Sequence, residues 1–177
     1  VAFEDLPEGR LTRMNVDYFQ YLDQLIAVLR DHGIVPVFQP VFHGYGWKGL
    51  QTAGNELSPE DYVRFCTYLV ARYGAGPSIW LVCGDGIGDA PSLNPAGHAI
   101  EKWDDYGHPA GMHYAPHGTT DSYQAEEWLD FQWCQTGHGA EHRPDILMSV
   151  YEQEPAKASA NGEPTYESMS GMDHASG

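Results

Sequence analysis

The sequence predicts an α/β domain built on a parallel β-sheet. Stretches typical of a strand and stretches typical of an amphipathic helix alternate about five times along the chain, and no two-residue hairpin turn joins neighbouring strands. Parallel strands need a crossover connection, usually a helix, whereas antiparallel strands are often joined by tight turns. A doubly wound sheet and a (β/α)8 barrel both fit this pattern.

The first predicted element is a helix over Asn15–Arg30. Asn15 is expected to cap its first turn, and Gly33 can supply the left-handed residue that closes its last turn. The apolar residues that recur along one side, and that we expect to face the core, are Phe19, Leu22, Leu25, Ile26 and Leu29.

A strand is predicted next, over Ile34–Phe42. This run is almost continuously apolar, which is typical of a strand that is buried on both faces beneath helices. Pro36 and Pro40 lack the N–H group that a ladder needs, so they count against a regular central strand.

A second helix and strand repeat the pattern. Ser58-Pro59-Glu60-Asp61 predicts a helix start, because it combines a capping serine, a proline in the first turn and two acidic residues. Tyr62, Phe65, Leu69 and Tyr73 continue as the buried stripe until Gly74. Ser78–Cys83 is the next predicted strand.

The rest of the chain contains shorter elements. We expect a helix over Pro95–Tyr106 and another within Pro144–Glu154. The strands are predicted over Ala110–Ala115, Leu129–Thr136 and, with few bulky apolar residues, Ala158–Asn161. No glycine-rich phosphate-binding loop follows any of the strands, so the sequence gives no support to a nucleotide-binding fold.

Composition excludes several classes of function. The 177 residues suffice for one domain, and 25 acidic against 9 basic residues give a formal net charge of −16. Such a surface repels phosphate backbones and anionic lipids, so we expect neither a nucleic-acid nor a membrane partner. Cys66, Cys83 and Cys134 are too few and too widely spaced for a disulfide framework or a CxxC metal site.

Polar residues collect directly after the predicted strands. Because the carboxyl ends of parallel strands lie on one face of the sheet, where sites assemble, we expect these side chains to share a site. In chain order they are His43, Trp47, Asp85, His113, His117, Gln135, His138 and Glu163.

Two carboxylates on different strand ends, among histidines and aromatic rings, favour glycoside hydrolysis. That reaction needs one carboxylic acid to protonate the leaving oxygen and one carboxylate to attack the anomeric carbon or activate water. A zinc-dependent hydrolase is an alternative, because four histidines and an aspartate offer metal ligands, although no His-x-His pair or His-Glu-x-x-His helix is present. A carbohydrate-binding or assembly subunit without catalysis is the other alternative.

Three runs of residues resemble the apiosidase-like glycoside hydrolases. They are Trp128-Leu129-Asp130-Phe131, Gln135-Thr136-Gly137-His138 and Asn161-Gly162-Glu163-Pro164-Thr165-Tyr166-Glu167. The similarity extends from about Asn15 to Met169, and it implies a (β/α)8 (TIM) barrel that cleaves plant polysaccharides of the pectic type without a cofactor or a metal.

The resemblance also implies roles for individual residues. Asp85 matches the acid/base after the fourth strand, and Glu163 matches the nucleophile after the seventh, in a mechanism that retains configuration. The substrate-binding residues expected from the resemblance and from the strand-end pattern are His43, Trp47, His113, His117, Gln135, His138 and Tyr166. An oligosaccharide partner and an extracellular or periplasmic location follow as expectations.

This sequence departs from the family pattern in two ways. Ala115-Pro116 stands where the family has a His-Pro pair, with His113 and His117 nearby. Strands one, two and eight have no counterpart, whereas a whole barrel usually takes about 250 residues. We therefore expect a single partial barrel domain over residues 1–177, with a core at about 15–169, that belongs to a longer protein or is completed by other chains.

Overall fold

The computed structural model describes residues 1–43, 57–86, 90–116, 121–136 and 143–164. A single five-stranded parallel sheet organises them, in the order β1-β2-β3-β4-β5. The strands are β1 (Val37–Phe38), β2 (Ile79–Leu81), β3 (Ala110–His113), β4 (Phe131–Gln135) and β5 (Ala158–Glu163). Each strand pairs with the strand before it in the sequence, so the sheet winds in one direction, as in a barrel and unlike a doubly wound sheet. The alternation of strands and helices that the sequence predicts is confirmed.

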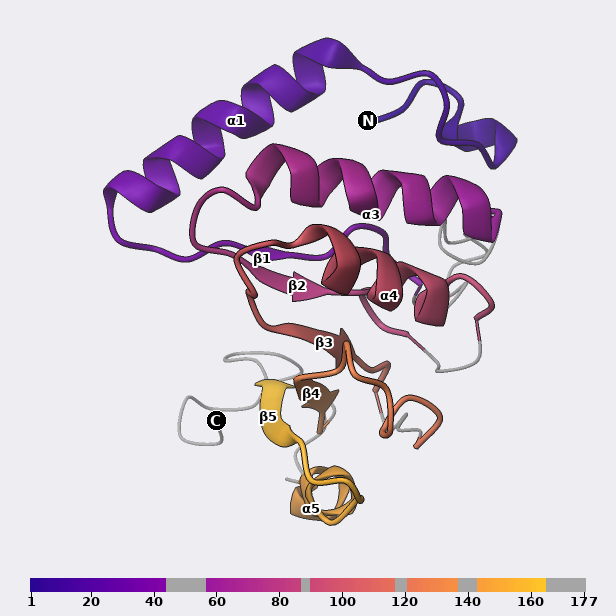
Figure 1. Cartoon of the computed structure of the whole chain (residues 1–177), viewed down its shortest axis with the longest axis vertical. Helices are drawn as coiled ribbons and strands as arrows, with labels where there is room; N and C mark the ends of the chain where they lie inside the picture. Colours follow the sequence, from indigo (N-terminus) through magenta and orange to yellow (C-terminus); the bar gives the residue numbers. More distant parts are fainter. Residues whose placement is uncertain (44–56, 87–89, 117–120, 137–142, 165–177) are drawn as a thin grey trace, which may run out of the picture.

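One helix precedes the first strand and others connect β1 to β2, β2 to β3 and β4 to β5, whereas the described residues between β3 and β4 form no helix. The helices are α1 (Val16–Asp31), α3 (Pro59–Tyr73), α4 (Leu93–Trp103) and α5 (Pro144–Tyr151), preceded by the short 3₁₀ helix η1 (Leu6–Glu8). Figure 1 shows α1, α3 and α4 in order from the top of the view and α5 at the bottom, below β5. None of the described helices is both long enough and apolar enough to cross a membrane.

The capping signals of the two longest helices are confirmed. The Asn15 side chain accepts a hydrogen bond from the N–H of Tyr18, and Ser58 accepts one from Asp61 at 3.2 Å. Such a cap stabilises a helix by about 1 kcal/mol. Gly33 has a φ of +71°, so it takes the left-handed conformation expected after α1.

The core lies between the helices and the sheet. Phe19 of α1 packs edge-on against Phe65 of α3, and Phe38 of β1 stacks between Tyr73 and Trp80. Further along the sheet, the fully buried Trp128 packs on Gly97 of α4, where a side chain would collide with the indole. The helices are thereby fixed on the strands whose ends carry the polar residues.

Two expectations from the sequence are wrong in detail. The strand predicted over Ile34–Phe42 is reduced to Val37–Phe38, and Ile34, Val35 and Val37 are exposed rather than buried. Pro36 and Pro40 lie on either side of the two residues that pair, which explains why the ladder is interrupted there and resumes only at Phe42, opposite Gly84.

Leu25 is also exposed, although the helical stripe predicted it to be buried. Phe19 and Ile26 alone of that stripe are fully buried, so α1 contacts the core over a narrower strip than its sequence indicates.

Candidate functional site

Three titratable side chains meet at the carboxyl end of the sheet. Asp85 follows β2, His113 ends β3 and Glu163 ends β5. One ligand atom from each lies within 4.8 Å of the other two. His113 lies between the acids, with its Nε2 atom 3.2 Å from Glu163 Oε2 and 3.9 Å from Asp85 Oδ1. The structure thus brings together residues that are far apart in the sequence.

Asp85 lies in a short segment whose backbone is paired on both sides, and its own backbone conformation is strained. Gly84 pairs with Phe42 and Gly86 pairs with Tyr114, which continues the ladder beyond β2. The N–H of Gly86 donates to the carbonyl of His113 at 2.8 Å. Asp85 itself has a φ of +52°, and it is the one residue other than glycine with a positive φ in the described chain. Non-glycine residues in this region are uncommon, and they concentrate at functional sites.

A bulge aligns Glu163 with Gln135. The register between β4 and β5 shifts at Cys134/Gln135, so that Cys134 pairs with Asn161 and Gln135 pairs with Glu163. Paired residues of parallel strands present their side chains on the same face, so the extra residue, Gly162, directs Glu163 toward the site. The indole of Trp133 occupies the space that a side chain at position 162 would need. The sequence analysis did not predict this bulge.

Gln135 joins the acid to the imidazole. Its Nε2 atom donates to Asp85 Oδ1 and lies 3.2 Å from His113 Nε2. The side chains of Asp85, His113 and Glu163 are 13%, 10% and 18% exposed, so they are shielded from bulk water yet reachable from outside. Such partial burial strengthens electrostatic interactions at a site.

His43 is placed beside this cluster but is buried. Its backbone N–H donates to the carbonyl of Gly84 at 2.7 Å, and its ring packs edge-on against Tyr62. Burial lowers the pKa of His43 and so favours the neutral ring. A hydrogen bond with the carbonyl of Val41 opposes this shift but is the smaller effect. With 1% of the residue exposed, its contact with substrate stays a prediction.

The other predicted binding residues are not described by the structure. Trp47, His117, His138 and Tyr166 lie outside the described residues. Sequence reasoning missed Gln39, whose Oε1 atom lies 3.3 Å from His113 Nδ1. An uncharged amide close to the end of a short strand carries no signal of its own that could have identified it.

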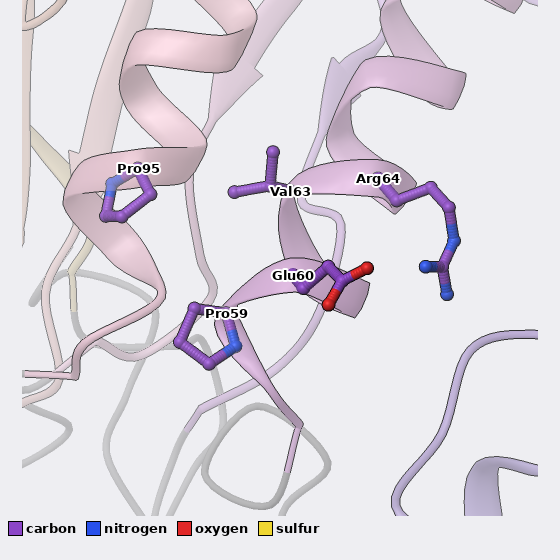
Figure 2. A pocket seen from close by; sticks show the side chains of 5 residues that line it. All are labelled: Pro59, Glu60, Val63, Arg64 and Pro95. Atoms are coloured by element: carbon purple, nitrogen blue, oxygen red, sulfur yellow. The ribbon is translucent and has the colours of Figure 1, made fainter.

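A surface depression of about 420 Å³ lies elsewhere, at the start of α3 and α4 (Figure 2). Pro59, Val63 and Pro95 give it an apolar lining, and Glu60 and Arg64 are its charged residues. This lining offers one carboxylate, whereas the cluster at the strand ends offers two. The cluster is therefore the stronger candidate for a catalytic site.

Comparisons with known proteins agree on the fold. A glycoside hydrolase family 5 protein from Bacteroides vulgatus ATCC 8482 superposes with a TM-score of 0.70 and 23% identity, over 85% of this chain and 34% of its own. A putative glycoside hydrolase from the same organism superposes with a TM-score of 0.53 and 22% identity, over 70% of this chain and 24% of its own. No curated protein matches the chain.

The chain thus spans about a third of the first of these structures, which agrees with a partial barrel made of consecutive βα units. The sequence of the apiosidase-like catalytic domain matches from residue 3 to residue 176. Because this match covers almost the whole sequence, the chain belongs to the family of apiosidase-like catalytic domains.

Proposed function

We propose that this chain carries the catalytic face of a glycoside hydrolase, with Asp85 as the general acid/base and Glu163 as the nucleophile. The observation that carries the proposal is the meeting of two carboxylates from separate strand ends at one imidazole, with oxygens of the two acids within 4.8 Å of each other. The family match supports the same class of reaction.

The spacing of the two acids favours retention of configuration. Retaining glycosidases hold their carboxyl groups about 5–5.5 Å apart, whereas inverting enzymes need about 6.5–9.5 Å to admit a water molecule. In the proposed reaction, Asp85 protonates the leaving glycosidic oxygen while Glu163 attacks the anomeric carbon to form a glycosyl ester. Asp85 then removes a proton from water, which hydrolyses the ester and restores both carboxyl groups.

Gln135 is suited to assist Asp85 in both steps. Its amide donates to Oδ1 of Asp85, which orients the carboxyl group and leaves Oδ2 to carry the transferred proton. Asp85 is placed after β2 and Glu163 at the end of β5, so the two acids approach a sugar from different parts of the rim.

The substrate proposed for this site is a pectic-type oligosaccharide. The family match supports a plant glycan, and both acids are partly exposed to solvent rather than enclosed in the core. The strong acidity of the chain agrees with a secreted protein as well as with a soluble one elsewhere, and we retain an extracellular or periplasmic location as part of the proposal.

Product analysis tests this proposal directly. The protein is incubated with pectic oligosaccharides, and the anomeric protons of the first product are followed by NMR before mutarotation. We expect a product with the configuration of the substrate. An inverted product would rule out Glu163 as a nucleophile, and calorimetric binding without any turnover would favour the non-catalytic carbohydrate-binding subunit.

A zinc-dependent hydrolase remains the second candidate, favoured by the three grouped ligand atoms of Asp85, His113 and Glu163. Catalytic zinc commonly has three protein ligands and one open position. However, an amide N–H of Gln135 is directed at Asp85 Oδ1 beside His113 Nε2, so a hydrogen-bond donor occupies the space that a cation would need. We expect EDTA to leave hydrolysis unchanged, and loss of activity that zinc restores would favour this candidate.

A further inference from the structure

Gln39 approaches His113 from the side opposite the two acids. It follows β1 directly, and its Oε1 atom lies 3.3 Å from Nδ1 of His113. An amide oxygen only accepts hydrogen bonds, so this contact requires a proton on Nδ1.

The other ring nitrogen faces a different set of groups. Nε2 lies 3.2 Å from the amide nitrogen of Gln135, 3.2 Å from Glu163 Oε2 and 3.9 Å from Asp85 Oδ1. Asp85 and Glu163 are the titratable groups that the described residues place at this nitrogen. The Gln135 N–H needs an acceptor, and an unprotonated Nε2 provides one.

We propose that Gln39 is a positioning residue that fixes the tautomer of His113. By accepting from Nδ1, it keeps one proton on that nitrogen whether the ring is neutral or charged. The lone pair of the neutral ring therefore lies on Nε2, the atom that faces both carboxylates. The hydrogen-bond partner of one imidazole nitrogen commonly sets the protonation of the other in this way.

A glycine makes room for this contact. A Cβ atom at Gly84, the residue before Asp85, would collide with Oε1 of Gln39 and lie 3.3 Å from the ring of Phe42. The same Gly84 pairs with Phe42 in the sheet, so its backbone cannot easily withdraw. The segment that carries the proposed acid is thus shaped to admit the Gln39 side chain, which supports the contact independently of the ring geometry.

The consequence rests on the proposed function. With its lone pair on Nε2, the neutral ring can accept from the amide of Gln135, which also donates to Asp85, so the ring holds Gln135 against the proposed acid/base. A neutral ring with its proton on Nε2 would instead direct that proton at Glu163 Oε2 and offer Gln135 no acceptor. Gln39 would in this way act through His113 on the chemical step and would affect kcat more than KM.

The tautomer is measured by long-range ¹H–¹⁵N correlation on histidine-labelled protein at about pH 9, where imidazole is neutral. The His113→Gln variant assigns the signals. We expect the Nδ1–H form in the wild type and in Gln39→Glu, which keeps an acceptor, and the Nε2–H form in Gln39→Leu, where the Glu163 carboxylate becomes the preferred acceptor. Gln20→Leu, an exposed glutamine on α1, is the matched control and should leave the pattern unchanged.

Kinetics complete the test. We expect Gln39→Leu to lower kcat on pectic oligosaccharides about tenfold with little change in KM, and Gln39→Glu to restore most of it. An Nε2–H ring in the wild type, or a tautomer that Gln39→Leu does not change, would overturn the inference even if the protein hydrolyses its substrate. The predicted tautomers in a protein without turnover would instead refute the proposed function and leave the role of Gln39 intact.

Discussion

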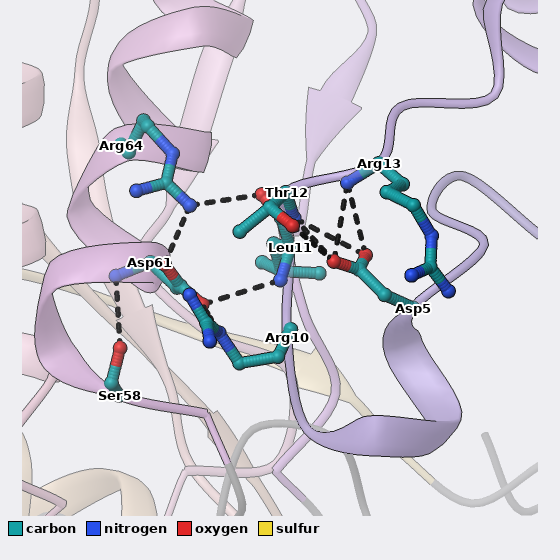
Figure 3. Close-up of polar contacts among 8 residues, drawn as sticks. All are labelled: Asp5, Arg10, Leu11, Thr12, Arg13, Ser58, Asp61 and Arg64. Carbon is teal, nitrogen blue, oxygen red and sulfur yellow. Dashed lines mark hydrogen bonds and ion pairs between the residues drawn. The ribbon is translucent and has the colours of Figure 1, made fainter.

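Two buried aspartates of this chain are held by opposite kinds of partner. Asp61 on α3 has a side chain that is 4% exposed, and it accepts hydrogen bonds from Arg10, Arg64 and the N–H of Leu11, as Figure 3 shows. Asp85, with a side chain that is 13% exposed, lies instead against the neutral amide of Gln135 and the ring of His113. No arginine or lysine contacts Asp85 within the described parts of the chain.

The difference separates a structural acid from one suited to catalysis. Burial alone would raise the pKa of Asp61, but the hydrogen bonds from Arg64, Arg10 and Leu11 outweigh it and lower the pKa. A carboxylate that two cations hold in its ionised form tethers the N-terminal segment to α3 and cannot readily carry a proton. A carboxyl group held by neutral partners can exchange one, as an acid/base must.

The largest expected effect comes from removing the proton that Asp85 would transfer. Asp85→Asn keeps an oxygen that accepts from Gln135, so the fold should be preserved. We expect kcat/KM on pectic oligosaccharides to fall by about 10² to 10⁴-fold, the contribution usual for general acid–base catalysis. Urea unfolding should give an unchanged midpoint, and full activity of the variant would remove Asp85 from the mechanism.

The next effect concerns the bulge that directs Glu163. In Gly162→Ala the new methyl group would overlap the indole of Trp133. The centroid of that indole lies 6.1 Å from the centroid of the His113 ring. Overpacking of this kind costs up to about 3 kcal/mol, and we expect both the unfolding free energy and kcat to fall.

Adding Trp133→Phe to this variant should recover part of the loss, because the smaller ring vacates some of the space. The two substitutions would then be non-additive in a double-mutant cycle. Strict additivity would mean that the indole is not what the methyl group displaces.

A moderate and purely structural effect is expected at the other aspartate. Asp61→Asn loses charge-assisted hydrogen bonds to Arg10 and Arg64, whose side chains are about half exposed to solvent. We expect the unfolding free energy to fall by about 2 kcal/mol, with kcat and KM unchanged. Asp105→Asn, in an exposed turn, is the matched control. A loss of activity without a loss of stability would contradict the division between the two aspartates.

The smallest expected effect is a dependence of stability on pH in the N-terminal segment. Burial alone would raise the pKa of Asp5, but hydrogen bonds from the Thr12 side chain and from the N–H groups of Thr12 and Arg13 lower it to about 2 (Figure 3). An unfolded aspartate titrates at about 3.9, so these contacts stabilise the fold fully above about pH 4.

That stabilisation is lost as the pH falls toward 2, because the folded carboxylate must then be protonated. Urea unfolding of the wild type between about pH 5 and pH 2 should show the decline, and Asp5→Asn should reduce its slope. An identical slope in the variant would show that other carboxylates account for the acid sensitivity.

The helices could be predicted well from the sequence because their signals are local. Asn15 and Ser58 cap their own first turns, and the buried side of α3 follows the apolar stripe through Tyr62, Phe65 and Leu69. The bounds of the strands were harder to predict, because they depend on pairing with segments that are distant in the sequence. The sequence predicts the last strand only over Ala158–Asn161, whereas β5 extends to Glu163 because β4 provides a ladder along its length.

The candidate site could be predicted in part, because several of its residues stand at the ends of predicted strands. Asp85, His113, Gln135 and Glu163 all follow or end strands, and the parallel topology alone brings such positions to one face. Gln39 and the bulge at Gly162 depend on side-chain contacts between strands, for which a single sequence carries no periodic signal. Trp47, His117, His138 and Tyr166 stay predictions.

The role of Glu163 is the central claim, and one substitution tests it most directly. Glu163→Gln preserves the size of the side chain and removes the anionic oxygen that would form the glycosyl ester, whereas Glu101→Gln removes an equal charge from the exposed part of α4. With both variants folded, we predict that hydrolysis of pectic oligosaccharides falls below detection in Glu163→Gln and is unchanged in Glu101→Gln. Turnover by Glu163→Gln at the wild-type rate would contradict the proposed mechanism.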